Sequence, residues 1–354
     1  MKRANKKTIF HIIWSFTTGG AETMLVNILN EQVKSSYNIH LIIINNMIDE
    51  ALIKKIDKRV YITRVNRTAG SRFNINFIIK LNYLLFKYNN ILAIHAHNSS
   101  IIRLILPLFW SKCVLTIHTT NCRCSRRDLI KYKNLYSISE SVAKEILERF
   151  SLNTKIIFNG IDFGKIKNKS KYIKHSPFRM VQIGRLSNYH KGHDVLLNAL
   201  SIIVKTNKNI QLDIIGEGDD LHYLVSLVSS LGLNNNVSFL GLKSQEYIFD
   251  NLCNYDLLVQ PSYFEGFGLT AVEGIAAKIP VLVSNIEGLS EIVANGKFGY
   301  VFTPGSIEQC ANTILKIIES TQIQDIINSA YTNAIEKYSV QNTSYKLLNA
   351  YENL

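Results

Sequence analysis

Residues 257–273 read LLVQPSYFEGFGLTAVE, and this stretch contains the transition that decides the fold. The apolar run 257–260 predicts a buried strand, and the residues from Leu269 onward predict a helix. Gly266 and Gly268 lie between the two and allow the backbone to approach a ligand closely where the helix begins. A strand that leads through a short loop into a helix is half of a βαβ unit, so this stretch indicates a parallel α/β sheet.

The same pattern occurs earlier, at residues 181–195, which read VQIGRLSNYHKGHDV. A predicted strand ends at Gly184, the loop after it carries Arg185 and Lys191, and a predicted helix begins near His193. Helix N-termini attract anions, and two cations in the same loop strengthen that attraction. The loop therefore predicts a diphosphate site that needs no metal, with two solvated surface cations as the alternative.

Strands and helices alternate along the rest of the chain. The first half has predicted strands at 9–16, 40–45, 60–65, 91–95, 114–118, 135–138 and 155–158, with helices at 21–34, 74–88 and 139–150. The second half has predicted strands at 179–183, 211–215, 237–240, 257–260, 280–284 and 300–302. We therefore expect the α/β class, with two Rossmann-like doubly wound domains facing an interdomain cleft. Ligands in such sheets lie beyond the carboxyl ends of the strands.

A Lys-rich, weakly apolar segment at 164–177 separates the two halves and is predicted to be the linker. The expected domains are an N-terminal Rossmann-like domain at 1–170 and a C-terminal one at 171–335, followed by a C-terminal helix at 336–354.

Composition excludes several classes of protein. The chain has 354 residues, 47% of them hydrophobic and 19% charged, which is enough for two domains and too apolar for disorder. Five Cys are too few for a disulfide scaffold, and their odd number predicts reduced thiols in a cytosol. The best apolar stretch, 101–110, is too short to cross a membrane. The basic and apolar N-terminus lacks a small-residue cleavage site, so it predicts a buried first strand in a cytoplasmic protein.

Charge is divided unequally between the halves. Residues 1–176 carry a net charge of +19 and residues 177–354 carry −6, within a total of +13. A basic half can meet nucleic acid, anionic lipid or a phosphorylated substrate, and a solvated Lys-rich surface is the alternative.

Together these features resemble a known family. The Glu265-x7-Glu273 spacing, preceded by Arg185 and Lys191 in a second α/β domain, is similar to the retaining family-4 glycosyltransferases of the GT-B fold, of the bacterial surface-polysaccharide type. Further segments resemble that family's turns: Thr18–Glu22, Thr116–His118, Asn159–Asp162, Gly216–Gly218, Val237–Gly241 and Ile286–Glu291. The last helix resembles the segment that crosses back to the N-terminal domain in that family.

The resemblance implies a role for each matching residue. Arg185 and Lys191 would hold the donor diphosphate, Glu273 the ribose hydroxyls, and Glu265 the hydroxyls of the transferred sugar. His118 would contact that sugar and act in catalysis with Glu265, Arg185 and Lys191. The remaining donor-binding positions are Gly19, Gly20, Leu240, Gly241, Gly266, Phe267, Gly268 and Leu269.

The resemblance also implies a reaction. A retaining, metal-independent hexosyl transfer would take the sugar from a nucleotide diphosphate sugar, with UDP favoured, to a saccharide or lipid-linked saccharide in capsule, lipopolysaccharide or exopolysaccharide synthesis. No cofactor, no metal and no nucleic-acid partner is expected. The absence of an Asp-x-Asp motif agrees with cations taking the place of Mg²⁺.

Other interpretations remain open at the level of sequence. A sugar-nucleotide epimerase on the same fold would share the diphosphate site. A non-enzymatic sugar-nucleotide binder would share the same motifs. A dinucleotide-dependent oxidoreductase is disfavoured because Gly216–Leu221 lacks the third small residue. A metal site of His118 with Cys113, Cys122 and Cys124 lacks the usual ligand spacing. His95 and His97 are predicted to be hydrogen-bonded packing residues.

A basic segment follows His118 directly and is expected on the acceptor side. Its cations are Arg123, Arg126, Arg127, Lys131 and Lys133, interleaved with Leu129, Ile130 and Tyr132. Such a mixture predicts an interfacial segment that meets anionic head groups, which would make the protein peripheral on the inner face of the cytoplasmic membrane. An ordinary basic surface loop is the alternative.

Overall fold

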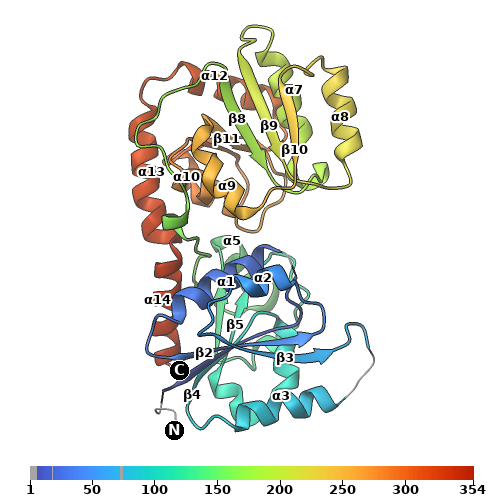
Figure 1. The fold of residues 1–354 in the computed structure, drawn as a ribbon, viewed down its shortest axis with the longest axis vertical. Coiled ribbons are helices and arrows are strands. Elements are labelled where there is room, and N and C mark those ends of the chain that lie inside the picture. Colours follow the sequence, from blue (N-terminus) through green and yellow to red (C-terminus); the bar gives the residue numbers. More distant parts are fainter. Residues whose placement is uncertain (1–5, 18, 72–74) are drawn as a thin grey trace. The chain divides into compact units, whose positions relative to one another are not determined.

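The computed structural model describes residues 6–17, 19–71 and 75–354, and the chain forms two compact units (Figure 1). The first unit takes in Met1–Ile161 and Tyr338–Leu354, and the second takes in Asp162–Lys337. Each unit is built on one sheet whose strands all pair in parallel. The predicted class, two doubly wound parallel α/β units, is therefore confirmed.

The first unit has a seven-stranded sheet in the order β3-β2-β1-β4-β5-β6-β7. Its strands are β1 (Thr8–Ile13), β2 (Asn38–Asn45), β3 (Tyr61–Arg67), β4 (Ile91–Ala96), β5 (Cys113–Ile117), β6 (Asn134–Ser137) and β7 (Lys155–Ile156). Its helices are α1 (Gly20–Gln32), α2 (Glu50–Lys54), α3 (Asn76–Phe86), α4 (Arg126–Leu129), α5 (Glu140–Phe150) and α14 (Val340–Glu352), with 3₁₀ turns η1 (Ser99–Leu104) and η2 (Pro107–Lys112). Every residue of β1 is buried, which confirms the predicted first strand.

The second unit has a six-stranded sheet in the order β10-β9-β8-β11-β12-β13. Its strands are β8 (Phe178–Ile183), β9 (Ile210–Ile215), β10 (Val237–Gly241), β11 (Leu257–Gln260), β12 (Val281–Ser284) and β13 (Tyr300–Phe302). Its helices are α6 (Asn188–Lys191), α7 (His193–Ile203), α8 (Leu221–Ser230), α9 (Gln245–Asn251), α10 (Leu269–Ala276), α11 (Leu289–Ile292), α12 (Ile307–Glu319) and α13 (Ile323–Tyr338), with 3₁₀ turns η3 (Phe163–Lys165), η4 (Leu252–Asn254) and η5 (Ala294–Gly296).

The strand order places a switch point in each sheet. It lies between β1 and β4 in the first unit and between β8 and β11 in the second. On one side of this point successive strands are added towards one edge of the sheet, and on the other side towards the opposite edge. Loops that follow neighbouring strands on either side of a switch point diverge and leave a crevice for a ligand. The two loops marked by the sequence, after β8 and after β11, are the ones at the switch point of the second unit.

The last helix, α14, completes the core of the first unit although it lies at the other end of the chain. Val340, Leu347 and Tyr351 are buried in the same apolar cluster as β1, α1 and β2. The Tyr351 hydroxyl lies 2.5 Å from Nδ1 of His95 on β4. The structure thus groups residues 338–354 with the first unit.

The predicted linker is not a free connection, and the two units divide after Ile161 instead of near residue 170. Residues 162–177 belong to the second unit and are held there by Asp256, which is fully buried. Its carboxylate lies 3.3 Å from Nζ of Lys169 and accepts hydrogen bonds from the backbone N–H of His175 and of Arg179. The buried charge needs these partners, so the segment packs instead of remaining solvated.

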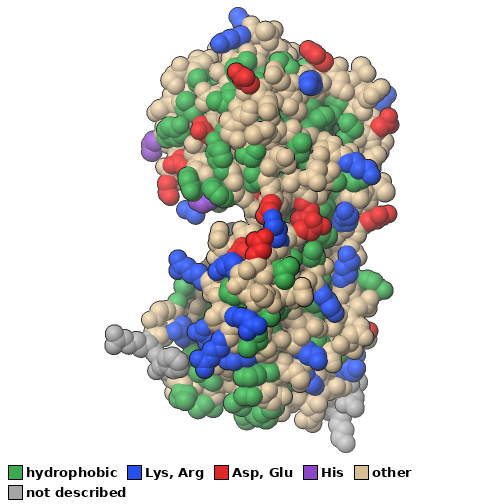
Figure 2. Space-filling view, turned by 180° about the vertical axis from the view of Figure 1, so that it is seen from behind, with side chains coloured by type: hydrophobic (Ala, Val, Ile, Leu, Met, Phe, Trp, Pro, Cys, Tyr) green, Lys and Arg blue, Asp and Glu red, His purple; other side chains and the backbone are tan. Residues whose placement is uncertain are grey.

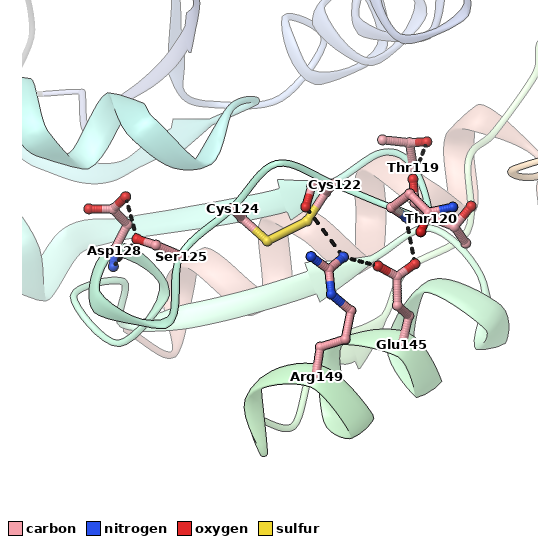
Figure 3. The surroundings of a disulfide bond; sticks show 9 residues. Thr119, Thr120, Cys122, Cys124, Ser125, Asp128, Glu145 and Arg149 are labelled. Atoms are coloured by element: carbon pink, nitrogen blue, oxygen red, sulfur yellow. Dashed lines mark hydrogen bonds and ion pairs between the residues drawn. A yellow bond between two sulfur atoms is a disulfide. The ribbon is translucent and has the colours of Figure 1, made fainter.

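The cysteines also differ from the prediction. Cys122 and Cys124 form a disulfide, whereas Cys113, Cys253 and Cys310 are free (Figure 3). The turn that contains them brings the two Cα atoms within 5.5 Å, a separation that a disulfide spans. From α5, Arg149 donates a hydrogen bond to the Cys122 carbonyl and pairs with Glu145.

In the part of the chain that the structure describes, no helix is long and apolar enough to span a membrane.

Candidate functional site

Two loops of the second unit, the one after β8 and the one after β11, lie against each other. The backbone N–H groups of Tyr263 and Phe264 donate to the carbonyl of His190, at 2.9 and 3.2 Å. Nζ of Lys191 lies 2.5 Å from Oε2 of Glu265. The cation-bearing loop and the glycine-rich loop, recognised separately in the sequence, therefore form one site.

Glycine is required where these loops touch. Gly192 has φ of +59°, and a Cβ there would lie 2.2 Å from the Pro261 carbonyl oxygen. Gly268 has φ of +90°, and a Cβ there would lie 2.4 Å from Cδ2 of Leu289. A side chain at Gly192 would push the two loops apart and disturb the contact between Lys191 and Glu265. A side chain at Gly268 would instead meet Leu289 of α11 and disturb the start of α10 at Leu269.

Arg185 lies in the loop before α6, whereas Lys191 is the last residue of α6, and the two side chains have different environments. Its side chain is 73% exposed and its guanidinium lies 3.7 Å from an almost fully exposed Asp219. An exposed ion pair of this kind contributes little, so Arg185 is free to turn towards an anion. The side chain of Lys191 is 22% exposed, and its ion pair holds the ammonium in one place, whereas Arg185 remains adaptable.

Glu273 lies one turn into α10, and burial raises the pKa of its carboxyl to about 8. At neutral pH the carboxyl is therefore neutral and can donate as well as accept a hydrogen bond. Glu265 is instead paired with a cation. The two glutamates of the motif thus differ in electrostatic character although they lie on one segment.

The end of β10 also lies at this edge of the sheet. The N–H of Gly216, which follows β9, donates to the Gly241 carbonyl at 3.0 Å. Gly241 has φ of +69° and open space around its Cα, so the chain turns sharply after Leu240. Leu240 and Gly241 are therefore at the carboxyl ends of the strands, where ligands bind in doubly wound sheets.

Sequence reasoning missed two aromatic residues of the site. Tyr189 and Phe264 come from the two loops and stack with ring centroids 5.5 Å apart and an angle of 29° between the planes. Both side chains are more than half exposed. Tyr189 lies two residues before Lys191 and Phe264 lies directly before Glu265. These positions were the signal, because a flat exposed ring beside charged groups suits a sugar or a base.

In the first unit, His118 ends a chain of hydrogen-bonded side chains that we call the histidine chain: Gln32, His11, His97 and His118. Oε1 of Gln32 lies 2.8 Å from Nε2 of His11. Nδ1 of His11 lies 3.0 Å from Nε2 of His97, and Nδ1 of His97 lies 3.0 Å from Nε2 of His118. The predicted packing role of His97 is confirmed. His11 and Gln32 were missed, since nothing in their spacing along the chain indicates the contact.

The histidine chain is neutral and has a direction. Burial lowers the pKa of His11 and of His118 to about 4, and that of His97 well below its usual value. A neutral imidazole has one N–H and one lone pair. With the Gln32 oxygen facing His11, each ring donates from Nε2 and accepts at Nδ1. Nδ1 of His118 is then a buried acceptor without a hydrogen-bond partner among the described residues.

Three of the buried imidazoles lie close together and are engaged in hydrogen bonds. One ring nitrogen each of His11, His95 and His97 lies within 4.8 Å of the others. However, His95 is engaged by the Tyr351 hydroxyl and by Thr116, and the other two rings bond each other. Their hydrogen bonds occupy the lone pairs and N–H groups, and this agrees with the predicted packing role of His95. The donors and acceptors satisfy one another without a cation.

At the start of α1, Gly19 is the residue before the helix and Gly20 its first residue. A Cβ on Gly19 would lie 2.5 Å from Oε2 of Glu22. Burial raises the pKa of the Glu22 carboxyl. Thr18, the first residue of the predicted loop, lies outside the described residues.

The segment after His118 does not have the predicted interfacial character. Leu129 and Tyr132 are buried, because the Tyr132 hydroxyl donates to the Ser99 carbonyl and accepts from the N–H of Ile102. Lys131 lies over the Trp110 ring, at 5.0 Å. Arg123, Arg126, Arg127 and Lys133 are exposed. Apart from Ile130, the apolar part of the segment belongs to the core.

Comparisons with known proteins agree with this arrangement. Residues 164–334 match the family described as "Glycosyl transferases group 1", which is almost the whole of the second unit. The "Uncharacterized glycosyltransferase MJ1607" of Methanocaldococcus jannaschii is 30% identical over 61% of this chain and 59% of its own. The "Capsular polysaccharide biosynthesis glycosyltransferase CapM" of Staphylococcus aureus is 29% identical over 59% of this chain and 58% of its own. The chain thus spans less than two thirds of these curated relatives.

A solved structure covers the whole chain. The crystal structure of Anabaena Alr3699/HepE in complex with UDP and glucose superposes with a TM-score of 0.78 at 21% identity, over 98% of this chain and 100% of that one. With its two parallel Rossmann-like sheets, the chain has the predicted GT-B fold.

Proposed function

We propose that this protein is a glycosyltransferase that moves a sugar from a nucleoside diphosphate sugar to a saccharide acceptor in the synthesis of a surface polysaccharide. One observation carries the proposal: Lys191 and Glu265 meet at the switch point of the sheet in the unit that matches the glycosyl transferase family. The match to a named capsular polysaccharide transferase supports the polysaccharide class. The matched family and the named relatives are transferases, so the epimerase alternative has no support.

The proposed reaction needs positive charge where negative charge develops. The bond between the sugar carbon and the diphosphate oxygen breaks, the hydroxyl oxygen of the acceptor takes the place of that oxygen, and the hydroxyl proton passes to the leaving diphosphate. The ammonium of Lys191, the guanidinium of Arg185 and the backbone N–H groups at the start of α10 stabilise the leaving diphosphate. In the free protein Glu265 neutralises Lys191, so the donor exchanges one anionic partner of Lys191 for another.

The two glutamates divide the donor between them in this proposal. Glu273 bonds the ribose hydroxyls, because its neutral carboxyl can both donate to and accept from a hydroxyl. Glu265 bonds hydroxyls of the transferred sugar once the diphosphate has occupied Lys191. We assign the acceptor to the first unit, where Nδ1 of His118 has no hydrogen-bond partner among the described residues and can accept a hydrogen bond from a sugar hydroxyl.

The finer assignments belong to the same proposal. We propose UDP as the nucleotide, because the superposed HepE structure holds UDP and glucose. A retaining, metal-independent reaction of the family-4 type follows from the Glu265-x7-Glu273 motif with Arg185 and Lys191. The acceptor side includes the exposed cations of the segment after His118, which suit a lipid diphosphate-linked saccharide.

The test is a donor screen followed by transfer. Thermal stabilisation by UDP and GDP identifies the nucleotide, and nucleotide release from UDP-sugars, with and without saccharide acceptors and with EDTA, identifies the reaction. The anomeric configuration of the product reports retention. Glu273→Ala, which removes both hydrogen-bonding groups, should weaken UDP binding, whereas Glu265→Gln should reduce turnover with less effect on UDP affinity. Failure of every nucleotide to stabilise the protein would contradict the proposal.

A further inference from the structure

Helix α3 presents apolar side chains to solvent along one face. Ile79, Tyr83 and Phe86 are 59%, 61% and 53% exposed, and Ile75, directly before the helix, is 63% exposed. Their spacing of three and four residues places them on one stripe of the helix surface. The opposite face is anchored by Leu81 and Leu85, which are fully buried. The helix is therefore apolar on both sides, although only one side is covered by the first unit.

A second segment extends this stripe. Leu106 and Leu108, at the start of η2, are 41% and 59% exposed. Asn82 of α3 joins the two segments, since its amide donates to the Leu104 carbonyl at 2.8 Å and accepts from the N–H of Leu106 at 3.0 Å. The rings of Phe86 and Phe109 also contact, with centroids 5.2 Å apart. We call the exposed set the α3 surface: Ile75, Ile79, Tyr83, Phe86, Leu106 and Leu108.

The stretch of sequence that contains the α3 surface is basic. From Lys58 to Arg127 it contains twelve Lys and Arg and no Asp or Glu, although Arg59, Arg64 and Arg103 pair with acids outside the stretch. Lys80 and Lys87 of α3 are exposed, and Nζ of Lys87 lies 4.6 Å from the centre of the Tyr83 ring. Figure 2 shows Lys and Arg side chains among apolar ones over the face of the first unit. Apolar and cationic groups are thus combined in one region.

We infer that the α3 surface docks on an anionic lipid bilayer. Apolar side chains on a fixed helix can enter the boundary between head groups and acyl chains, and the flanking cations can meet lipid phosphates. A contiguous exposed apolar patch is typical of an interaction site. A symmetric contact between two copies would set cations against cations, and a nucleic acid would leave the apolar groups uncovered. The inference is independent of the transferase reaction.

The test is co-sedimentation of the full chain with vesicles of phosphatidylcholine containing about one third phosphatidylglycerol, and with vesicles of phosphatidylcholine alone. The variant combines Ile79→Gln, Tyr83→Gln and Leu108→Gln. Its matched control combines Leu147→Gln, Tyr345→Gln and Leu242→Gln, which remove an exposed Leu, Tyr and Leu outside the α3 surface. Melting temperatures show that both variants fold.

Wild type and control should bind the anionic vesicles, more weakly as salt is added, and bind the neutral vesicles much less. The α3 variant should bind at least about tenfold more weakly. Equal binding by the α3 variant and wild type would overturn the inference, as would an equal loss in the control. If the wild-type protein does not bind vesicles and is a dimer, and the α3 variant is a monomer, the surface joins two copies. If it ignores vesicles and retains an oligonucleotide, the partner is nucleic acid. Either result overturns the inference.

Discussion

Lys191 in the second unit and His118 in the first both follow a strand of a parallel sheet, yet their surroundings differ in kind. Lys191 is a charged group paired with a carboxylate, close to solvent and to an exposed arginine. His118 is neutral and receives its orientation from three buried side chains behind it. A diphosphate that leaves with negative charge requires cations, whereas a sugar hydroxyl requires only a directed lone pair or N–H.

The comparison therefore separates a site that works by charge from one that works by orientation. One substitution removes the charge of Lys191, and the loss of activity should be large because the remaining groups cannot replace that charge. Gln32, His11 and His97 together orient His118, so a substitution in the histidine chain should reduce activity only in part. Each prediction below tests one side of this contrast.

The largest effect is expected from Lys191→Ala. The substitution removes a charge-assisted contact to the leaving diphosphate, worth about 1.5–3 kcal/mol, so kcat/KM for a nucleotide sugar should fall by about tenfold to more than a hundredfold. Steady-state kinetics measure this, with Lys205→Ala as a control because Lys205 is exposed outside the site. Arg185→Ala should also reduce turnover, although its exposed guanidinium is more easily replaced by solvent. A Lys191→Ala enzyme with wild-type kcat/KM would remove this loop from the reaction.

A smaller loss, of about tenfold in kcat, is expected from Gln32→Leu. The change leaves the buried Nε2–H of His11 without its acceptor, so the direction of the histidine chain is no longer set. The donor KM should change less than kcat, because Lys191, Glu265 and Glu273 of the second unit hold the donor in this proposal. Nitrogen-15 NMR reports the tautomer of His118, which a general loss of stability would not change. An unchanged tautomer with reduced kcat would assign Gln32 a structural role only.

The strands and the charged loops were predictable because their signals are local. Glu265, Gly268 and Glu273 lie on one strand–loop–helix segment, and hydrophobic runs mark the strands around them. The histidine chain was not predictable from the same kind of signal, because Gln32 and His11 are joined only when α1 packs on the sheet. The 164–177 segment was misjudged for a similar reason, since its partner Asp256 comes much later in the chain.

Glu273 offers a test of the charged site through pH. Burial raises the pKa of its carboxyl from 4.5 to about 8, so the folded protein retains a proton that the unfolded chain has released. The stability contributed by this group should fall as pH rises from about 4.5 to about 8 and then remain constant. Glu273→Gln removes the dependence, so the melting temperature of the variant should gain on wild type by a few degrees between about pH 6 and pH 9. If the melting temperatures of the two proteins change with pH in the same way, Glu273 is solvated and its pKa is not raised.

The weakest effect is expected where charge lacks apolar support, in the segment after His118. Replacing Arg123, Arg126, Arg127, Lys131 and Lys133 by Gln should lower binding to anionic vesicles by about threefold at low salt and leave UDP affinity unchanged. Five freely placed cations would each contribute about 1 kcal/mol and change partitioning by orders of magnitude. However, Arg126 donates to the Phe150 carbonyl, and Lys131 lies over Trp110.

The salt dependence separates this segment from the α3 surface. Without its cations the protein should retain the part of vesicle binding that survives high salt, because that part comes from the apolar groups. The α3 variant should show the reverse, a small residual binding that salt abolishes. Co-sedimentation of both variants across a salt series measures the two contributions on one protein. If the Gln variant of the segment loses as much binding as the α3 variant, the cations after His118 face the bilayer directly and the α3 surface is only part of a larger contact.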